Sequence, residues 1–448
     1  MIDATRARAI RILIVASVVA ISVSCTVGPD YVRPPVAVPP AYKEAGDAKV
    51  TEARSAQPRG RWWEIFGDAE LDALEAQVDV NNQTIRAAEA RVRQAQALVE
   101  IARAPGFLTL NAGGSNQKLG LVAGWELDLW GRIRRSVEAS TAAAESSADD
   151  LAAARLSLQA QVAQDYFLLR VQDAEIRLLQ DSAARYERSL QLTRNQYAVG
   201  VASRGDVVQA EAQLYSTRAQ ALEAEVTRSQ LEHAIAVLIG KPPAELGIVA
   251  TPMNVTYPAV PPALPSELLE RRPDIAAAER RMAAANAQIG VAEAAFYPSV
   301  RLFAGGGFDI NFAGGVALAQ FLFDGGLRQA QSAQANAAYD ENVANYRQTV
   351  LSAFREVEDN LAALRILEDE SAVQAAAVRA ARESVTITNN QYRAGIVNYL
   401  SVVVVQAAAL INERAELGIL GRRLVASVTL IKALGGGWEM EAPKATKG

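Results

Sequence analysis

One six-residue motif occurs twice in the chain, each time at the end of a long stretch that lacks helix breakers. Asn195–Gly200 returns as Asn390–Gly395, and in each copy about 68 residues without glycine or proline precede the glycine. An uninterrupted helix of that length would be about 100 Å long at 1.5 Å per residue. Since no compact domain needs such a rod, the repeat predicts a duplicated architecture of long helices.

A segment near the start of each copy has the spacing of a coiled coil. Apolar residues recur at alternating steps of three and four, with alanine at every second position. They are Ile85, Ala88, Val92, Ala95, Val99 and Ala102 in the first copy, and Ile275, Ala278, Met282, Ala285, Ile289 and Ala292 in the second. Because alanine lets helix backbones approach closely, we expect these segments to pack tightly in pairs.

Each copy also contains a short stretch with the period of a β-strand. From Lys118 to Leu129, apolar and polar residues alternate, which predicts a strand with one apolar and one polar face. Its predicted partner is 107–112, across a turn at 113–116. The second copy offers 299–304, a glycine-rich turn at 305–307 and a return run at 316–323. The sequence thus predicts two hairpins, at about 105–128 and 298–323.

Glycines and polar residues mark the ends of the predicted helices. The long helices should begin after Gly131 and Gly325-Gly326, and Gly200 and Gly395 should end them in the left-handed conformation. Ser203 and Asn398, three residues further on, are suitable N-caps for the helices that run back.

The composition excludes several classes of function. A formal net charge of −5 excludes a general nucleic-acid binder, and one cysteine with one histidine leaves no disulfide framework and no imidazole-rich metal site. His233, between Glu232 and Ala234, is interpreted as a structural residue. The sequence shows no nucleophile motif and no phosphate-binding loop, so we expect no enzyme and no cofactor.

The N-terminus has the organisation of a secretory signal peptide. Three arginines precede an apolar run at 12–23, which Ser24 and Cys25 follow. This run is short for a transmembrane helix, and no other segment approaches the required length of about 20 apolar residues. Cys25 sits where bacterial lipoprotein signals place the acylated residue, which predicts a covalent lipid such as palmitate. Ser22 stands where leucine is usual, so an unmodified cysteine is the alternative.

The chain therefore divides into six segments along the sequence. They are a signal peptide at 1–24, a lipidated proline-rich tether at 25–60, a first repeat at 61–240, a proline-rich linker at 241–264, a second repeat at 265–438 and a tail at 439–448.

Four strands per chain cannot close a barrel, and an open sheet in lipid would leave its edge hydrogen bonds unmet. Three chains would supply twelve strands, enough to surround an aqueous lumen. In such a barrel the side chains of Lys118, Glu126 and Asp128 would face the lumen, and those of Leu121 and Trp125 the lipid, together with Leu119 and Leu127. The alternative is that the hairpins are ordinary soluble β-ribbons.

Several motifs in fixed order resemble the outer membrane efflux protein family, the TolC-like group, and within it the OprM-like and NodT-like lipoprotein branch. The resemblance covers about 62–438. Its motifs are Trp125–Arg132, Arg272–Ile275, Ala285–Gly290, Phe323–Gly326 and Ala433–Trp438.

This resemblance implies a homotrimer with a twelve-stranded barrel in the outer membrane and an α-helical barrel that crosses the periplasm. It implies the exit duct of a tripartite pump that exports small toxic compounds. The implied partners are a periplasmic adaptor protein and an inner-membrane transporter of the resistance-nodulation-division type. Two alternatives are the duct of a type I protein secretion system and a structural periplasmic coiled-coil lipoprotein.

The resemblance also implies roles for the two turns between long helices. The adaptor is expected to contact them at Val199, Gly200 and Val201, and at Ala394, Gly395 and Ile396. The alternative interpretation is a plain helix connection, which would need both glycines as well.

A gate is expected near the same turns. The family suggests a contact between Asp206 and Tyr392 that holds the helices closed, whereas Ser203-x-x-Asp206 alone reads as a capping box. Relatives place an acidic residue where this chain has Val404. If Leu400 and Val404 line the closed end, the constriction is apolar and resists ions by dewetting. The short hairpins further predict minimal surface loops.

Overall fold

We describe a computed structural model of residues 26–45, 60–115, 118–252, 269, 271–307 and 312–437. Cys25 and the predicted signal peptide lie outside these residues, as does the C-terminal tail. The chain forms two compact units. Unit 1 comprises 1–38, 87–153 and 273–352, and unit 2 comprises 39–86, 154–272 and 353–448. Each unit therefore combines segments from both halves of the chain.

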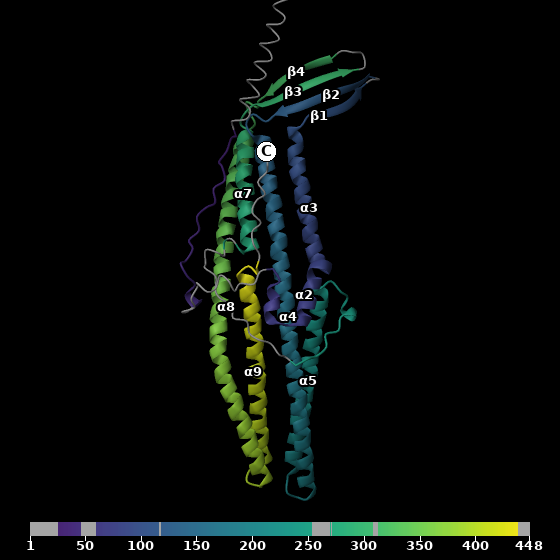
Figure 1. Cartoon of the computed structure of the whole chain (residues 1–448), viewed down its shortest axis with the longest axis vertical. Helices are drawn as coiled ribbons and strands as arrows, with labels where there is room; N and C mark the ends of the chain where they lie inside the picture. The colour runs from purple at the N-terminus through teal and green to yellow at the C-terminus, as the bar shows by residue number, and fades with distance from the viewer. Residues whose placement is uncertain are drawn as a thin grey trace, which may run out of the picture. The chain divides into compact units, whose positions relative to one another are not determined.

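Long helices dominate the fold (Figure 1), and the two longest have 67 residues each. The helices are α2 (Ala69–Asn81), α3 (Gln83–Arg103), α4 (Arg132–Ala198), α5 (Arg204–Leu238), α7 (Pro273–Ala294), α8 (Leu327–Arg393) and α9 (Tyr399–Ala433). Short 3₁₀ turns are Lys43–Ala45, Trp62–Phe66, Ala104–Gly106 and Pro243–Glu245. The predicted helix starts after Gly131 and Gly326 are confirmed, and these glycines have φ of +79° and +90°.

The four strands of unit 1 form one antiparallel sheet in the order β1-β2-β3-β4 (Figure 1). Their bounds are β1 (Thr109–Ser115), β2 (Lys118–Leu127), β3 (Ser299–Gly307) and β4 (Phe312–Ala319). The two predicted hairpins are confirmed. Pairing runs to Ser115 and Lys118 in the first and to Gly306 and Phe312 in the second, so only short connections remain.

The predicted turn at 305–307 is wrong, because these glycines belong to β3. A Cβ at Gly305 would lie 3.3 Å from the carbonyl oxygen of Leu121 on the neighbouring strand, so the close approach of the strands favours glycine there. The return strand is also shifted. It ends at Ala319, which pairs with Ser299, because β3 begins at Ser299 and offers no partner further on.

Alanine-rich packing joins α4 to α7 in unit 1. Ala277 is buried on α7, and its carbonyl oxygen accepts a hydrogen bond of 3.1 Å from the Ser146 hydroxyl on α4. Ile275 and Met282 of the predicted seam are fully buried. The expectation of tight pairing through small residues is confirmed for this segment.

The N-terminal segment 26–38 is bound along unit 1. Arg135 donates to the carbonyl of Gly28 and to the carboxylate of Asp30, at 3.1 and 2.8 Å. Asn286 donates to the carbonyl of Pro29 at 2.9 Å. A Cβ at Gly290 would lie 2.9 Å from the Val27 carbonyl oxygen, so this glycine of α7 makes room for the segment.

In unit 2 aromatic residues of the turn Trp62–Phe66 pack against α4. The Phe66 and Phe167 rings lie 4.8 Å apart, and Tyr166 donates a hydrogen bond of 2.7 Å to Asp68, the N-cap of α2. Gly240 has φ +72°, and a Cβ there would lie 2.3 Å from the carbonyl oxygen of Asn81. Only glycine fits at that position.

Candidate functional site

The two turns between long helices lie at the same end of unit 2 (Figure 1), and both have the Schellman geometry. In the first, the amide of Gly200 bonds the Tyr197 carbonyl at 3.0 Å and that of Val201 bonds Gln196 at 2.8 Å. In the second, the amide of Gly395 bonds the Tyr392 carbonyl at 3.0 Å. Gly200 and Gly395 have φ of +78° and +72°, which confirms the predicted left-handed stops.

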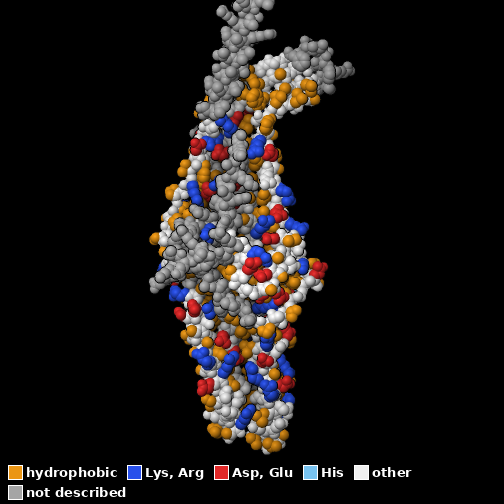
Figure 2. Space-filling view, viewed as in Figure 1, with side chains coloured by type: hydrophobic (Ala, Val, Ile, Leu, Met, Phe, Trp, Pro, Cys, Tyr) orange, Lys and Arg blue, Asp and Glu red, His pale blue; other side chains and the backbone are white. Residues whose placement is uncertain are grey.

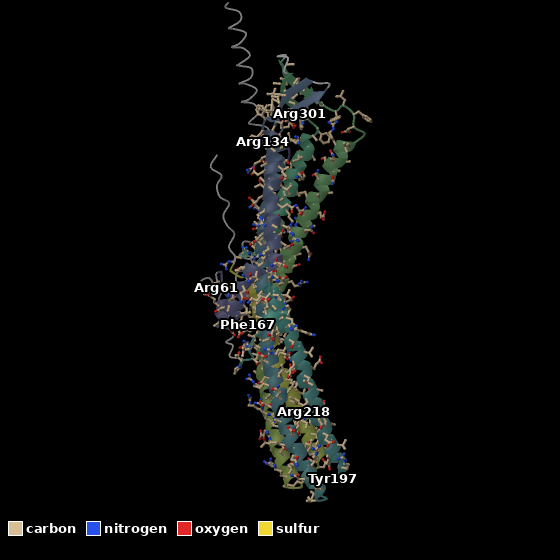
Figure 3. All side chains as sticks on the ribbon, turned by 90° about the vertical axis from the view of Figure 1, so that its right-hand side faces the viewer. Arg61, Arg134, Phe167, Tyr197, Arg218 and Arg301 are labelled. Carbon is tan, nitrogen blue, oxygen red and sulfur yellow. The ribbon has the colours of Figure 1, made fainter. Side chains whose placement is uncertain are left out.

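Large apolar side chains are exposed on these turns. Val199 and Val201 are both 75% exposed, and Ile396 is 72% exposed. Figure 2 shows hydrophobic side chains gathered over this end, and Figure 3 labels Tyr197 there. Such a patch is costly in a free chain and is typical of a surface that another protein covers.

A buried cluster beneath the turns holds all four helices together. It contains Tyr186 and Leu190 of α4, Val207 and Leu214 of α5, and Tyr392, Tyr399 and Val402. The rings of Tyr392 and Tyr399 meet edge to face with centroids 5.5 Å apart. These contacts fix how α8 turns back into α9.

The expected gate residues make other bonds in this structure. The Asp206 carboxylate accepts hydrogen bonds from the backbone amide and the hydroxyl of Ser203, at 2.9 and 2.8 Å. The Ser203 hydroxyl in turn accepts from the Asp206 amide at 3.1 Å, which completes a capping box. The Tyr392 hydroxyl donates to Gln196 of α4. The capping interpretation is therefore confirmed, and a direct role of Asp206 toward Tyr392 stays a prediction.

Leu400 and Val404 lie one turn apart near the start of α9 and point away from the packed core. They are 49% and 58% exposed, whereas Val402 between them is fully buried. α9 thus presents an apolar stripe that none of the described residues covers fully.

The sheet has one continuously apolar face and one face where small and polar residues predominate, although Val122 and Phe303 also lie on it. Direct partners across an antiparallel sheet share a face. Trp125 opposes Leu302, which opposes Val316, so the apolar face runs across three strands. Leu110, Leu121, Leu127, Val300 and Leu318 extend this face by the same registers. Glu126 opposes Arg301 on the other face.

The residues expected on the lumen side divide into three cases. Lys118, the first residue of β2, pairs with Ser115 of β1. Its side chain lies outside what the structure describes. Glu126 is confirmed on the polar face. Asp128 lies beyond the end of β2, so the predicted extension of that strand to Leu129 is wrong. Its carboxylate instead accepts from the amides of Ile133 and Arg134, both at 2.9 Å, because the first amides of a helix lack intrahelical partners. Figure 3 labels Arg134 and Arg301 at this junction.

Within the described residues, no cluster of histidine, cysteine and acidic side chains is placed to hold a metal ion. Among the helices of the same part of the chain, none combines the length and apolar character needed to cross a membrane.

Comparison with known proteins decides the family. The family model described as outer membrane efflux protein matches residues 74–241 and 264–436. The chain belongs to the outer membrane efflux protein family. As a member, it is an outer-membrane channel for efflux and not an enzyme.

Relatives of known role align with nearly the whole efflux protein. The toluene efflux pump outer membrane protein TtgC of Pseudomonas putida is 32% identical, over 94% of this chain and 95% of TtgC. The pyoverdine export outer membrane protein OpmQ of Pseudomonas aeruginosa is 32% identical, over 89% of this chain and 91% of OpmQ.

Solved structures of outer-membrane channels have the same fold as this efflux protein. The OprN channel superposes with a TM-score of 0.80 at 30% identity, covering 92% of this chain and 100% of that one. The open state of the Neisseria gonorrhoeae MtrE channel gives 0.82 at 29% identity, over 93% and 99% of the two chains.

Sequence reasoning missed the path of residues 26–38 and a polar groove between α4, α8 and α9. Prolines in the first gave a signal for extension but none for what the segment contacts. The groove brings together residues about 200 positions apart, such as Arg188 and Arg393, which no local pattern connects.

Proposed function

We propose that three copies of the chain form an exit duct, with twelve strands in the outer membrane. The observation that carries this proposal is the four-stranded sheet. One of its faces is apolar, and its edge strands β1 and β4 each pair on one side only among the described strands. Unpaired edges are unfavourable in lipid, and strands from neighbouring copies would satisfy them.

The exposed turns of unit 2 would bind a periplasmic adaptor protein in a tripartite pump. Val199, Val201 and Ile396 supply an apolar contact, and Gly200 and Gly395 let each chain reverse compactly. Ala394 belongs to the same turn. An inner-membrane transporter of the resistance-nodulation-division type would complete the pump. The names of relatives refer to toluene, pyoverdine and cations, which supports small toxic compounds or metabolites as the cargo class.

The periplasmic end would close through α9. In a trimer, the exposed Leu400 and Val404 of each chain would face the same residues of the other two chains across the channel axis. Together they would form an apolar constriction. Asp206 and Tyr392 would contribute by fixing the helix pairs that carry the stripe. Burial raises the pKa of Tyr399, and the negative charge of Asp206 raises it further. The Asp206 charge is therefore close enough to Tyr399 to act on it.

A lipid on Cys25 would anchor the chain beside the sheet. The amide of Val27, two residues later, donates to the carbonyl of Trp130 at 3.1 Å, and Trp130 follows β2 by three residues. A Cβ at Gly131 would lie 2.7 Å from the Thr26 side chain, so the segment is held close to the end of the strand. This position of the segment supports the proposal that an acyl chain enters the membrane next to the barrel.

Deletion of the gene, with a susceptibility panel of antibiotics, solvents and detergents, tests the proposed function. We expect sensitivity to at least one compound to rise and to be restored by the wild-type gene. Chemical cross-linking of the purified protein should give trimers. Unchanged sensitivity to every compound, or a purified monomer without ion conductance in a planar bilayer, would contradict the proposal. Complementation by Cys25→Ser separates anchoring from transport, since only anchoring requires the thiol.

A further inference from the structure

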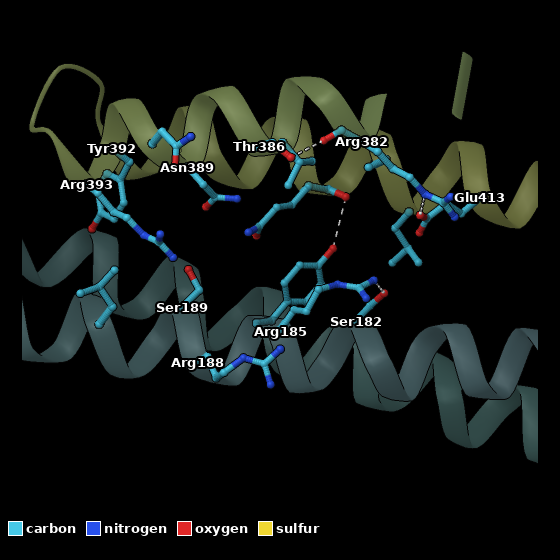
Figure 4. Close-up of a pocket in the computed structure, with 17 residues that line it drawn as sticks. Ser182, Arg185, Arg188, Ser189, Arg382, Thr386, Asn389, Tyr392, Arg393 and Glu413 are labelled. Carbon is cyan, nitrogen blue, oxygen red and sulfur yellow. Dashed lines mark hydrogen bonds and ion pairs between the residues drawn. The ribbon is translucent and has the colours of Figure 1, made fainter. Parts of the chain in front are cut away.

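A groove of about 580 Å³ runs between α4, α8 and α9 in unit 2 (Figure 4). Its volume lies in the range of sites that bind small organic molecules, about 300–1,000 Å³. Leu192, Val385 and Leu410 contribute apolar side chains to its lining. Polar side chains such as those of Ser189 and Asn389 also line it.

Positive charge dominates the lining of this groove. Arg185, Arg188, Arg382 and Arg393 contribute to it, and the only acidic residue in the lining is Glu413, which accepts from Arg382 at 2.6 Å. Arg185 donates to the hydroxyl of Ser182 at 2.8 Å. Among the residues that the structure describes, Arg188 and Arg393 have no ion pair. Exposed arginines are usually solvated, but here both line one groove.

A second groove in the same unit provides a contrast. Its lining includes Arg218 and Glu187, which form an ion pair at 3.1 Å. The arginine there is compensated by a carboxylate on the facing helix, whereas Arg188 and Arg393 are not compensated by any described carboxylate.

A buried acceptor in the charged groove also lacks a partner. Gln406 on α9 is only 8% exposed, and its Oε1 accepts no hydrogen bond from any described residue. Its backbone carbonyl already accepts from the Tyr186 hydroxyl at 3.2 Å. An unsatisfied buried acceptor is unfavourable, so the site favours a ligand that brings a donor.

We propose that this groove binds a small organic anion that carries an apolar body and a hydrogen-bond donor. The guanidinium groups of Arg188 and Arg393 would pair with its carboxylate, since the planar fork of arginine suits that geometry. Gln406 would accept from its hydroxyl or amide, and Leu192 and Val385 would contact its apolar body. The proposal does not depend on the proposed transport function, because it concerns equilibrium binding to the purified protein.

Binding of 6-hydroxy-2-naphthoate to the full-length protein in a nonionic detergent tests the proposal. This probe has a carboxylate, a hydroxyl donor and a flat apolar body, and its fluorescence can be titrated. We expect saturable binding that Arg188→Ala combined with Arg393→Ala weakens at least about tenfold. Gln406→Leu should weaken the binding of 6-hydroxy-2-naphthoate. It should leave the binding of 6-methoxy-2-naphthoate little affected, because that compound has no donor.

The matched control is Arg177→Ala combined with Arg379→Ala. These exposed arginines lie on the same two helices outside the groove, so the change in net charge is identical. Equal weakening in the control would show a general charge effect and overturn the proposal. Equally tight binding of 6-hydroxy-2-naphthamide, or no saturable binding at all, would overturn it too. Far-ultraviolet circular dichroism and trimer content check that each variant is folded.

Discussion

Glu126 accepts two hydrogen bonds from Arg132, of 2.6 and 3.2 Å, and one of 3.3 Å from Arg301. Arg132 is the first residue of α4 and Arg301 lies in β3, so a single carboxylate on β2 ties two strands to a helix. The Glu126 side chain is only 15% exposed. Because the carboxylate is largely shielded from water, loss of its charge should affect stability more than loss of a charge in an exposed ion pair.

Replacing Glu126 with glutamine should lower the stability of the protein by about 1–3 kcal/mol, because two arginines lose their charged acceptor. Thermal unfolding in detergent measures the effect. Glu100→Gln is the control, since Glu100 forms an exposed pair with Arg103 at 2.9 Å and should change stability by less than about 0.5 kcal/mol. Equal shifts in the two variants would show that the junction is not stabilised by Glu126.

The capping and gating interpretations of Asp206 can be separated. Asp206→Ala and Ser203→Ala each break the capping box and should each cost about 1 kcal/mol. If Asp206 also acts on the gate, only its replacement should raise the resting conductance of channels in a planar bilayer. Equal conductance in both variants would leave Asp206 with the capping role alone.

Burial raises the pKa of Glu75 on α2 to about 9 from its usual value of 4.5, and the charges of Asp79 and Asp72 add to the effect. The side chain is fully buried, and neither carboxylate oxygen has a hydrogen-bond partner among the described residues. Between the two pKa values the folded protein keeps a proton that the unfolded chain releases. The free energy of unfolding should therefore fall as the pH rises through this range.

Glu75→Gln should remove this pH dependence, because glutamine resembles the protonated acid. We expect the variant to match the wild type near pH 5 and to exceed it by about 4 kcal/mol near pH 8, which is the linkage expected over about three pH units that lie between the two pKa values. Thermal unfolding at both pH values measures the difference. Glu225→Gln, at an exposed position of α5, should follow the wild type at each pH. Parallel curves for Glu75→Gln and the wild type would contradict the prediction.

Val404 allows a prediction of how strongly cations block the closed channel. An apolar constriction at Leu400 and Val404 has no carboxylates to bind them, so divalent and trivalent cations on the periplasmic side should block little of the conductance. Val404→Asp should introduce block at micromolar concentrations, because three copies would place three carboxylates close together. Ala408→Asp, one turn further along α9 at another exposed position, is the control. Strong block of the wild type would exclude an apolar constriction.

The sequence predicted the parts of the fold that follow local chemistry. Gly200 and Gly395 end helices because a left-handed residue is needed there, and Ser203 caps the next helix through atoms three residues away. The glycines of β3 resemble a turn in sequence because glycine marks both turns and close strand contacts, and only the register distinguishes the two. Gly315 is such a contact, since a Cβ there would lie 3.1 Å from the Phe303 ring.

The segment 26–38 and the arginine groove could not be predicted for a different reason. Asp30 meets Arg135, and Arg188 lines one groove with Arg393, only after distant helices have packed. Periodicity reports which face of an element is buried, but it contains no information about which other element covers that face. The exposed Val199 and Val404 were found because a family resemblance supplied the missing context.

The two faces of the sheet should respond oppositely to a new charge, if the apolar face meets lipid. Val316 opposes Leu302 on the apolar face, and its neighbour Ala317 opposes Arg301 on the polar face. A carboxylate in the lipid-facing band costs up to about 2 kcal/mol at each of three copies, whereas one beside Arg301 gains an ion partner. Val316→Glu should therefore reduce the amount of trimer in outer-membrane fractions, and Ala317→Glu should not. The amount of heat-resistant oligomer on gels measures the trimer. Adjacent positions lie at nearly the same depth, so the pair isolates the face from the depth. Similar losses in both variants would mean that the sheet does not face lipid on the side of Val316.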